Sequence, residues 1–219
     1  ERREPTPAGR QSWSSRVGGQ WSRFWFAAVD PSGLNGARVL VGALVLTWLL
    51  SFAGHQQEFF GLGGVFDARA YQETARMPIE SSPLVGWSPL YALRTPLALN
   101  LFYFGSILAA LLLTLGVATR IVAPLTWLSV VAFTSNPAMW FGGDALLLML
   151  SFYIMIGCLL DGLEKIPQSP LAIFGSPQAP IWRMLAGKSE DRETTSTAAN
   201  LTMRLMQVHL AIEIGRAHV

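Results

Sequence analysis

The stretch Asn136–Gly162, NPAMWFGGDALLLMLSFYIMIGCLLDG, decides the fold class of this chain. It carries no charged side chain from Ala145 to Leu160, and two aromatic residues come shortly before this apolar run. Together these residues reach the roughly 20 that a helix needs to cross the hydrocarbon core of a bilayer. Asp144 is expected to be the N-cap, because its carboxylate can accept hydrogen bonds from the first unpaired backbone amides. The stretch therefore predicts a transmembrane helix that starts after Asp144.

The composition of the whole chain agrees with a membrane protein. Hydrophobic residues make up 51% of the 219 residues and charged residues only 14%, and the mean hydropathy is +0.37. A water-soluble domain with this balance would expose extensive apolar surface. The net charge is only +2 and the basic residues are scattered, which excludes a nucleic-acid partner. The single cysteine, Cys158, lies inside the apolar run and is expected to be a packing residue.

The same pattern recurs along the chain. Three further complete spans are predicted at Gly36–Ala53, Leu97–Val117 and Ile121–Ser135, and Leu201–Ile212 begins a fifth that has about half the required length. The sequence thus predicts an all-α, polytopic transmembrane helix bundle with four complete spans plus the start of a fifth, in a domain over residues 30–212.

Two features inside these spans predict how the helices pack. Gly105 and Ala109 form a small-xxx-small pair that would let another helix approach closely, and Pro124 is expected in the first turn of its helix. Arg38 lies one turn inside the first span, and we expect its side chain to reach back to the interface. A buried functional cation is the alternative for Arg38. A pair between Arg38 and Asp144 is not expected, because the two enter the membrane from opposite sides.

Both ends of the chain differ from the spans. Residues 1–29 form a polar arm that is expected to be disordered over its first 16 residues, and Trp21–Phe26 suits a short interfacial helix. The last seven residues, Glu213–Val219, interrupt an apolar run and match the translation of one frame of a common sequencing adapter. We therefore expect residues 213–219 to be a sequencing artefact and the transmembrane domain to be partial.

Basic residues in the connections predict the orientation. With the N-terminus in the cytoplasm, ten basic residues face the cytoplasm and three face the other side: Arg2, Arg3, Arg10, Arg16, Arg23, Arg120, Lys165, Arg183, Lys188 and Arg192 against Arg69, Arg76 and Arg94. This favours a multi-pass protein of the cell inner (plasma) membrane with a cytoplasmic N-terminus.

Two outer connections are the candidates for a functional site. The connection Gly54–Thr95 is long and polar, and such loops often carry function. His55 and Glu58 in this loop are three residues apart and are predicted to bind substrate as a proton-handling pair; a solvated helix end is the alternative. With no third ligand in reach, no metal site is expected. We expect this loop and the entry loop Asn136–Asp144 to form one site, with Asn136 and Asp144 as catalytic candidates.

Five segments in this order resemble the HTTM family, the membrane domain shared by vitamin K-dependent gamma-glutamyl carboxylase and many bacterial relatives. They are DPSGLNGARVLVG, EFFGLGGVF, LTLGVATRIVAPLTW, SNPAMWFGGDALLLMLSFYIMI and RLMQVHLAI, between Asp30 and Ile212. No single segment is specific, and the resemblance rests on their order and on the NP…GGD entry.

The resemblance implies a reaction in a helix bundle. It implies that a reduced quinone is oxygenated and that the resulting base removes a proton from a glutamate side chain of a peptide substrate, which then captures carbon dioxide. The family's carboxylases use a lysine after a stretch like RLMQVHLAI, and an Asn-His pair where this chain has Asn136 and Pro137. Asn136 matches the pair, whereas Pro137 departs from it, and the partial domain is expected to be inactive.

Three functions therefore remain open. The first is an HTTM-type enzyme, at most carboxylase-like, that acts on a lipid-soluble quinone or a peptide at the outer membrane face. The second is a transporter-like subunit, which would need intramembrane charges, inverted repeats or broken helices. The third is a non-catalytic membrane anchor or assembly module, which Pro137 favours.

Overall fold

The computed structural model describes residues 13–76, 87–136, 142–164 and 195–216, and these residues are predominantly helical. Three of the described helices are long and apolar enough to cross a membrane: α2 (Ser32–Leu50), α5 (Pro96–Leu115) and α7 (Gly142–Glu164). The predicted all-α fold with membrane-spanning helices is confirmed at this level. Helix α6 (Thr119–Thr134) is apolar but has only 16 residues, so the third predicted span falls short of the other three.

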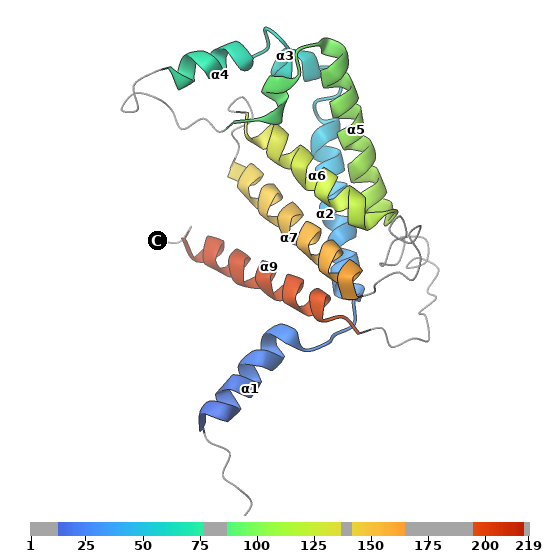
Figure 1. Cartoon of the computed structure of the whole chain (residues 1–219), viewed down its shortest axis with the longest axis vertical. Helices are drawn as coiled ribbons and strands as arrows, with labels where there is room; N and C mark the ends of the chain where they lie inside the picture. Colours follow the sequence, from blue (N-terminus) through green and yellow to red (C-terminus); the bar gives the residue numbers. More distant parts are fainter. Residues whose placement is uncertain (1–12, 77–86, 137–141, 165–194, 217–219) are drawn as a thin grey trace, which may run out of the picture.

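Figure 1 shows how the helices are arranged. Helices α2, α5, α6 and α7 run side by side, and α9 (Thr197–Arg216) packs against α7. The chain reverses between α5 and α6 over three residues, with Gly116 (φ +78°) and Ala118 (φ +48°) in the left-handed region. The two helices are therefore antiparallel neighbours, as the short connection predicts.

The long connection after α2 is more structured than the sequence suggests. It holds α3 (Gln56–Phe60), α4 (Ala68–Ala75) and the 3₁₀ helix η1 (Pro89–Ala92), all at the end of the bundle where α2 finishes. Asp67 caps α4 by accepting hydrogen bonds from the backbone amides of Arg69 (2.9 Å) and Ala70 (3.0 Å). These amides, together with the amide of Gly63, stabilise the carboxylate and hold the pKa of Asp67 below its usual value.

The buried core is centred on Phe133 of α6, whose side chain has no exposed surface. Four other rings, from α2, α3 and α5, have centroids between 4.9 and 6.4 Å from that of Phe133: Phe60, Phe102, Tyr103 and Trp48. The hydroxyl of Tyr103 donates to the carbonyl of Leu49 at 2.6 Å, so the polar end of this ring is satisfied inside the core.

The closest helix contacts differ from the predicted one. Among the described residues, a β-carbon at Gly105 would meet no atom within 4 Å, so the predicted close approach of another helix is not found at Gly105. Helix α2 approaches α5 at Gly42 instead, where a β-carbon would lie 2.5 Å from Oγ1 and 3.0 Å from the backbone nitrogen of Thr114. Gly157 of α7 has the same role, because a β-carbon there would lie 2.8 Å from Oγ1 of Thr202 in α9.

The side chain of Arg38 is buried within the bundle instead of extending from its surface. The residue has no exposed surface, and its Nη1 atom donates to the carbonyls of Leu113 and, at 3.1 Å, Thr114. The last carbonyls of a helix have no partner within that helix, and a cation at this end also interacts favourably with the helix dipole. Arg38 therefore closes the C-terminal end of α5.

Two helix starts also differ from the sequence prediction. Helix α6 begins at Thr119, which makes Pro124 its sixth residue and places it inside the helix rather than in the first turn. Helix α7 begins at Gly142, so Asp144 lies within its first turn and is not the N-cap. An acidic side chain in the first turn still interacts favourably with the helix dipole.

The two ends of the chain contribute one helix each. Helix α1 (Trp13–Phe26) contains the predicted interfacial cluster and starts four residues before the expected end of the disordered arm, so that expectation is wrong for residues 13–16. Helix α9 contains the start of the predicted fifth span and continues to Arg216. The origin of residues 213–219 as a sequencing artefact stays a prediction.

Candidate functional site

His55 and Glu58 form the predicted pair. The Nδ1 atom of His55 lies 3.1 Å from Oε2 of Glu58, but the two side chains are 62% and 73% exposed. The neighbouring glutamines turn the other way: Gln56 and Gln57 donate to Oδ1 of Asn100 at 3.3 and 2.8 Å. The pair therefore lies on the exposed side of α3. This geometry fits both a solvated helix end and a proton-handling pair.

Asn136 joins the start of the entry loop to the Gly54–Thr95 connection. Its side chain is 1% exposed, and Nδ2 donates to the carbonyl of Phe66 at 3.1 Å. Phe66 belongs to the Gly54–Thr95 connection, so the predicted meeting of the two loops occurs at this hydrogen bond. Pro137, which follows Asn136, lies outside the described residues.

Asp144 lies at the same end of the bundle as Asn136. It is the third residue of α7 and is partly exposed. The next residue, Ala145, lines a groove on the flank of the bundle. Asp144 is therefore at the end of this groove, whereas His55 and Glu58 belong to the separate surface of α3.

The groove lies between α6, α7 and α9 and has a volume of about 940 Å³. Its walls are almost entirely apolar or aromatic, with lining residues Trp127, Val131, Ala145, Leu146, Leu148, Met149, Phe152, Tyr153, His209, Leu210, Glu213 and Ile214. The α6 residues come from the second half of that helix and the α7 residues from its first half. The groove therefore occupies the half of the bundle in which α6 ends and α7 begins, near Asn136 and Asp144.

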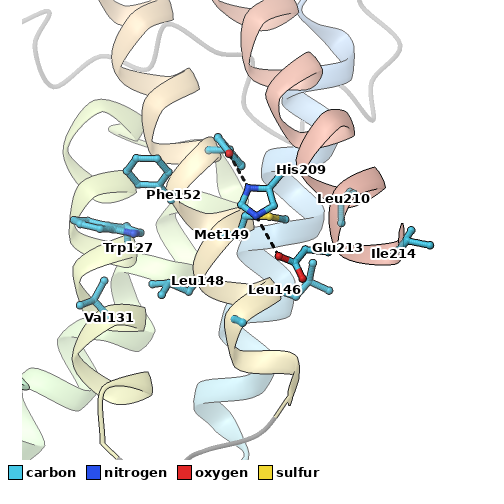
Figure 2. Close-up of a pocket in the computed structure, with 12 residues that line it drawn as sticks. Trp127, Val131, Leu146, Leu148, Met149, Phe152, His209, Leu210, Glu213 and Ile214 are labelled. Atoms are coloured by element: carbon cyan, nitrogen blue, oxygen red, sulfur yellow. Dashed lines mark hydrogen bonds and ion pairs between the residues drawn. The ribbon is translucent and has the colours of Figure 1, made fainter. Parts of the chain in front are cut away.

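Tyr153 and His209 are the polar centre of the groove. The Tyr153 hydroxyl lies 2.9 Å from Nδ1 of His209, and the ring centroids are 5.8 Å apart. Figure 2 shows the His209 ring between α7 and α9, where Nε2 lies 3.6 Å from Oε1 of Glu213. Glu213 belongs to the segment that is predicted to be a sequencing artefact, and Tyr153 and His209 are the polar groups of the groove outside that segment.

The chemical capacity of this pair follows from the tautomer of the imidazole. When the Tyr153 hydroxyl donates to Nδ1, the ring proton lies on Nε2, and Nε2 becomes a donor toward Oε1 of Glu213 or toward a ligand oxygen in the groove. Tyr153 lies in α7, one of the three described helices that are long and apolar enough to cross a membrane, and polar side chains within such helices often mark a binding or transport site. Within the described residues, no group of three His, Cys, Asp or Glu side chains is placed to hold a metal ion.

His209 lies in the predicted start of the fifth span, Leu201–Ile212, and Tyr153 lies in the predicted span that follows Asp144, but neither residue was singled out from the sequence. The two lie 56 residues apart, and one tyrosine in an apolar span does not show which helix it faces. A histidine within a predicted span was the only feature of the sequence that could have pointed to this site. Comparisons with protein-family models, with curated proteins and with solved structures gave no match for this chain.

Proposed function

We propose that this chain is a multi-span membrane protein of the HTTM type and that its lateral groove binds a lipid-soluble quinone. The observation that carries the proposal is the hydrogen-bonded pair of Tyr153 and His209 in a groove of about 940 Å³ whose other lining residues, apart from Glu213, are apolar or aromatic. Pockets for small molecules are typically apolar, with a few placed polar groups that fix the orientation of the ligand. The order of the five family-like segments supports the same family.

The side chains of the groove suit a quinone. Trp127 and Phe152, whose ring centroids are 5.7 Å apart, offer flat apolar surface to a ring and its isoprenoid tail. Nε2 of His209 can donate to a carbonyl oxygen of the ring, and Tyr153 holds the imidazole in the tautomer that does so. Because His209 is 39% exposed on the flank of the bundle, a ligand dissolved in the bilayer can enter from the side.

We also propose that α6 crosses the membrane as a fourth span. The ends of α5 and α7 both contact residues near the start of α2: Thr114 contacts Arg38, and Gly157 lies close to Leu34. Helix α6 begins where α5 ends and finishes before α7 begins, so it must return across the same layer. Its 16 residues span about 24 Å, and the flanking turns supply the remaining length of a core of about 30 Å.

The basic residues of the connections support a cytoplasmic N-terminus in the inner (plasma) membrane. In that orientation α6 ends and α7 begins at the outer face, which places the groove in the outer half of the bilayer. A peptide substrate at the outer face would meet two separate surfaces, the one near α3 that carries His55 and Glu58 and the end of the groove near Asp144.

A non-catalytic anchor or assembly module is the second candidate function. Its supporting observation is the role of Asn136, whose amide is buried and donates to the Phe66 carbonyl. This contact gives Asn136 a structural task that requires no reaction. In this case the groove between α7 and α9 would hold a helix of another protein rather than a quinone.

Binding of a short-chain quinone to the chain in nanodiscs tests the proposal, with quenching of Trp127 fluorescence as the signal. We expect His209→Leu to weaken binding about 3- to 10-fold, the effect of one lost hydrogen bond. His209→Gln should retain most of the affinity, because its amide can still donate. The affinity of Tyr153→Phe should lie between those of the two His209 variants, because without the hydroxyl the imidazole is no longer held in one tautomer.

The matched control is Leu40→Ala on α2, whose side chain is 73% exposed outside the groove. Its affinity for the quinone should equal that of the unchanged chain. A second control, Trp127→Phe, removes the reporting tryptophan and should therefore remove most of the quenching. If His209→Leu binds the quinone as well as Leu40→Ala does, the groove is not a quinone site. A second protein copy in each nanodisc would then support the assembly module.

A further inference from the structure

Helix α1 presents an apolar stripe to its surroundings. Val17, Trp21 and Phe24 follow the three- to four-residue spacing that places side chains on one side of a helix. Val17 is 43% exposed, Trp21 64% and Phe24 39%. The ring of Trp25 lies 5.8 Å from Trp21 and 5.1 Å from Phe24, which makes the exposed surface continuous and aromatic.

Contacts with α9 fix the position of α1. The side chain of Asn200 donates to the carbonyl of Phe24 at 3.0 Å and so satisfies one of the last carbonyls of the helix. The guanidinium of Arg204 lies 4.5 Å from the centroid of the Phe24 ring. Just after α1, Val29 and Ser196 exchange two backbone hydrogen bonds of 3.3 and 2.8 Å.

The position and charge of α1 indicate what covers the stripe. Helix α1 lies at the end of the bundle where α2 begins, and only five residues separate the two helices. Between Trp13 and Phe26 there is no acidic residue, and the two basic residues, Arg16 and Arg23, are seven positions apart. Arg23, whose side chain is exposed, lies about a quarter-turn from Phe24 and so flanks the stripe.

We propose that α1 is an interfacial helix that binds the anionic phospholipids of the leaflet at this end of the bundle. The aromatic stripe inserts at the level of the headgroups, where tryptophan and phenylalanine are favoured. Arg23 extends along the flank to the lipid phosphates, as long basic side chains do at interfaces, and Arg16 adds a second positive charge to the same helix. This proposal is independent of the ligand of the lateral groove.

Cysteine alkylation in nanodiscs, which expose both membrane faces to water, tests the proposal. Trp21→Cys places the thiol on the stripe, and Ser22→Cys places it about a quarter-turn away, on the polar side. The chain with Cys158 alone is the blank, because that thiol has no exposed surface. A charged, membrane-impermeant maleimide then reports how often each position reaches water.

In nanodiscs with phosphatidylglycerol, we expect Trp21→Cys to react at least ten-fold more slowly than Ser22→Cys. Adding Arg16→Gln or Arg23→Gln should raise the rate at position 21 about five-fold per arginine, from the typical contribution of a basic residue at an anionic surface. Replacing phosphatidylglycerol by pure phosphatidylcholine should raise the alkylation rate at position 21 in the same way.

Two outcomes overturn the proposal. Equal, rapid alkylation of both positions in anionic nanodiscs would show that α1 stands in water. Slow alkylation of Trp21→Cys whose rate changes neither with lipid charge nor with the arginine substitutions would show that protein, or an uncharged surface, covers the stripe. Circular dichroism of each variant shows whether its helices are intact.

Discussion

The guanidinium of Arg38 lies directly against the backbone of Gly116. A β-carbon added to Gly116 would lie 2.9 Å from both Nη1 and Nη2 of Arg38, and the glycine has a φ of +78°. Arg38 reaches this position because it donates to the carbonyls of Leu113 and Thr114 at the end of α5. The turn from α5 to α6 is therefore held from across the bundle by a side chain of α2.

Gly116→Ala is expected to destabilise the fold by about 2 kcal/mol or more. An L-residue in the left-handed region costs roughly 1–2 kcal/mol, and the methyl group would also displace Arg38 from its carbonyl partners. The thermal unfolding midpoint in detergent measures the effect. Gly105→Ala is the matched control on the same helix, because its β-carbon meets open space; it should be neutral or stabilise by up to about 1 kcal/mol.

Gly42→Ala tests the close approach of α2 to α5. The new methyl group would overlap Oγ1 of Thr114 and crowd its backbone nitrogen, and overpacking of this kind typically costs about 1–3 kcal/mol. Gly36→Ala on the same helix meets no atom within 4 Å and should not destabilise. Because the clash includes backbone, adding Thr114→Ala should restore only part of the loss. A Gly42→Ala variant with unchanged thermal unfolding would contradict this contact.

The apolar spans were predictable because length and hydropathy alone decide whether a helix can cross a bilayer. The packing faces were not, since side chains that face lipid are as apolar as those in the core. Gly105 and Gly42 show this: both lie in apolar runs, and only the position of Thr114 makes Gly42 the contact.

The partners of polar residues were also beyond the sequence. Arg38 was assigned to the interface because it lies near a helix end, but the carbonyl of Leu113 that it binds is 75 positions away. His209 and Tyr153 are likewise distant in the chain. The contact of Asn136 was easier to predict. The Gly54–Thr95 connection and the entry loop were expected on the same side of the bundle, and the Asn136–Phe66 hydrogen bond joins them.

Asn136→Ala separates a structural from a catalytic role. Loss of the amide leaves the Phe66 carbonyl without this donor, and we expect a loss of about 1–3 kcal/mol in stability. The folded fraction should still bind quinone with unchanged affinity. Thr134→Ala, which removes a hydroxyl bonded only within its own helix, is the control with a smaller effect. Unchanged stability with lost quinone binding would instead place Asn136 in contact with the ligand.

Tyr91→Phe should raise stability and flatten its dependence on alkaline pH. The Tyr91 ring stacks on Tyr71 with a centroid distance of 4.7 Å, and within the described residues its buried hydroxyl has no hydrogen-bond partner. Burial, with a smaller effect from Tyr71, raises the pKa of Tyr91 to about 12 from its ordinary 10.0.

A tyrosine whose pKa is raised in the folded protein ionises first in the unfolded chain. Its contribution to stability is therefore present below pH 10 and is lost as the pH rises from 10 toward 12. Thermal unfolding in detergent between pH 9 and 11.5 should show a steeper decline for the unchanged chain than for Tyr91→Phe. Tyr71→Phe keeps the buried hydroxyl of Tyr91 and should retain the steep decline. Parallel curves for all three proteins would show that the Tyr91 hydroxyl is solvated.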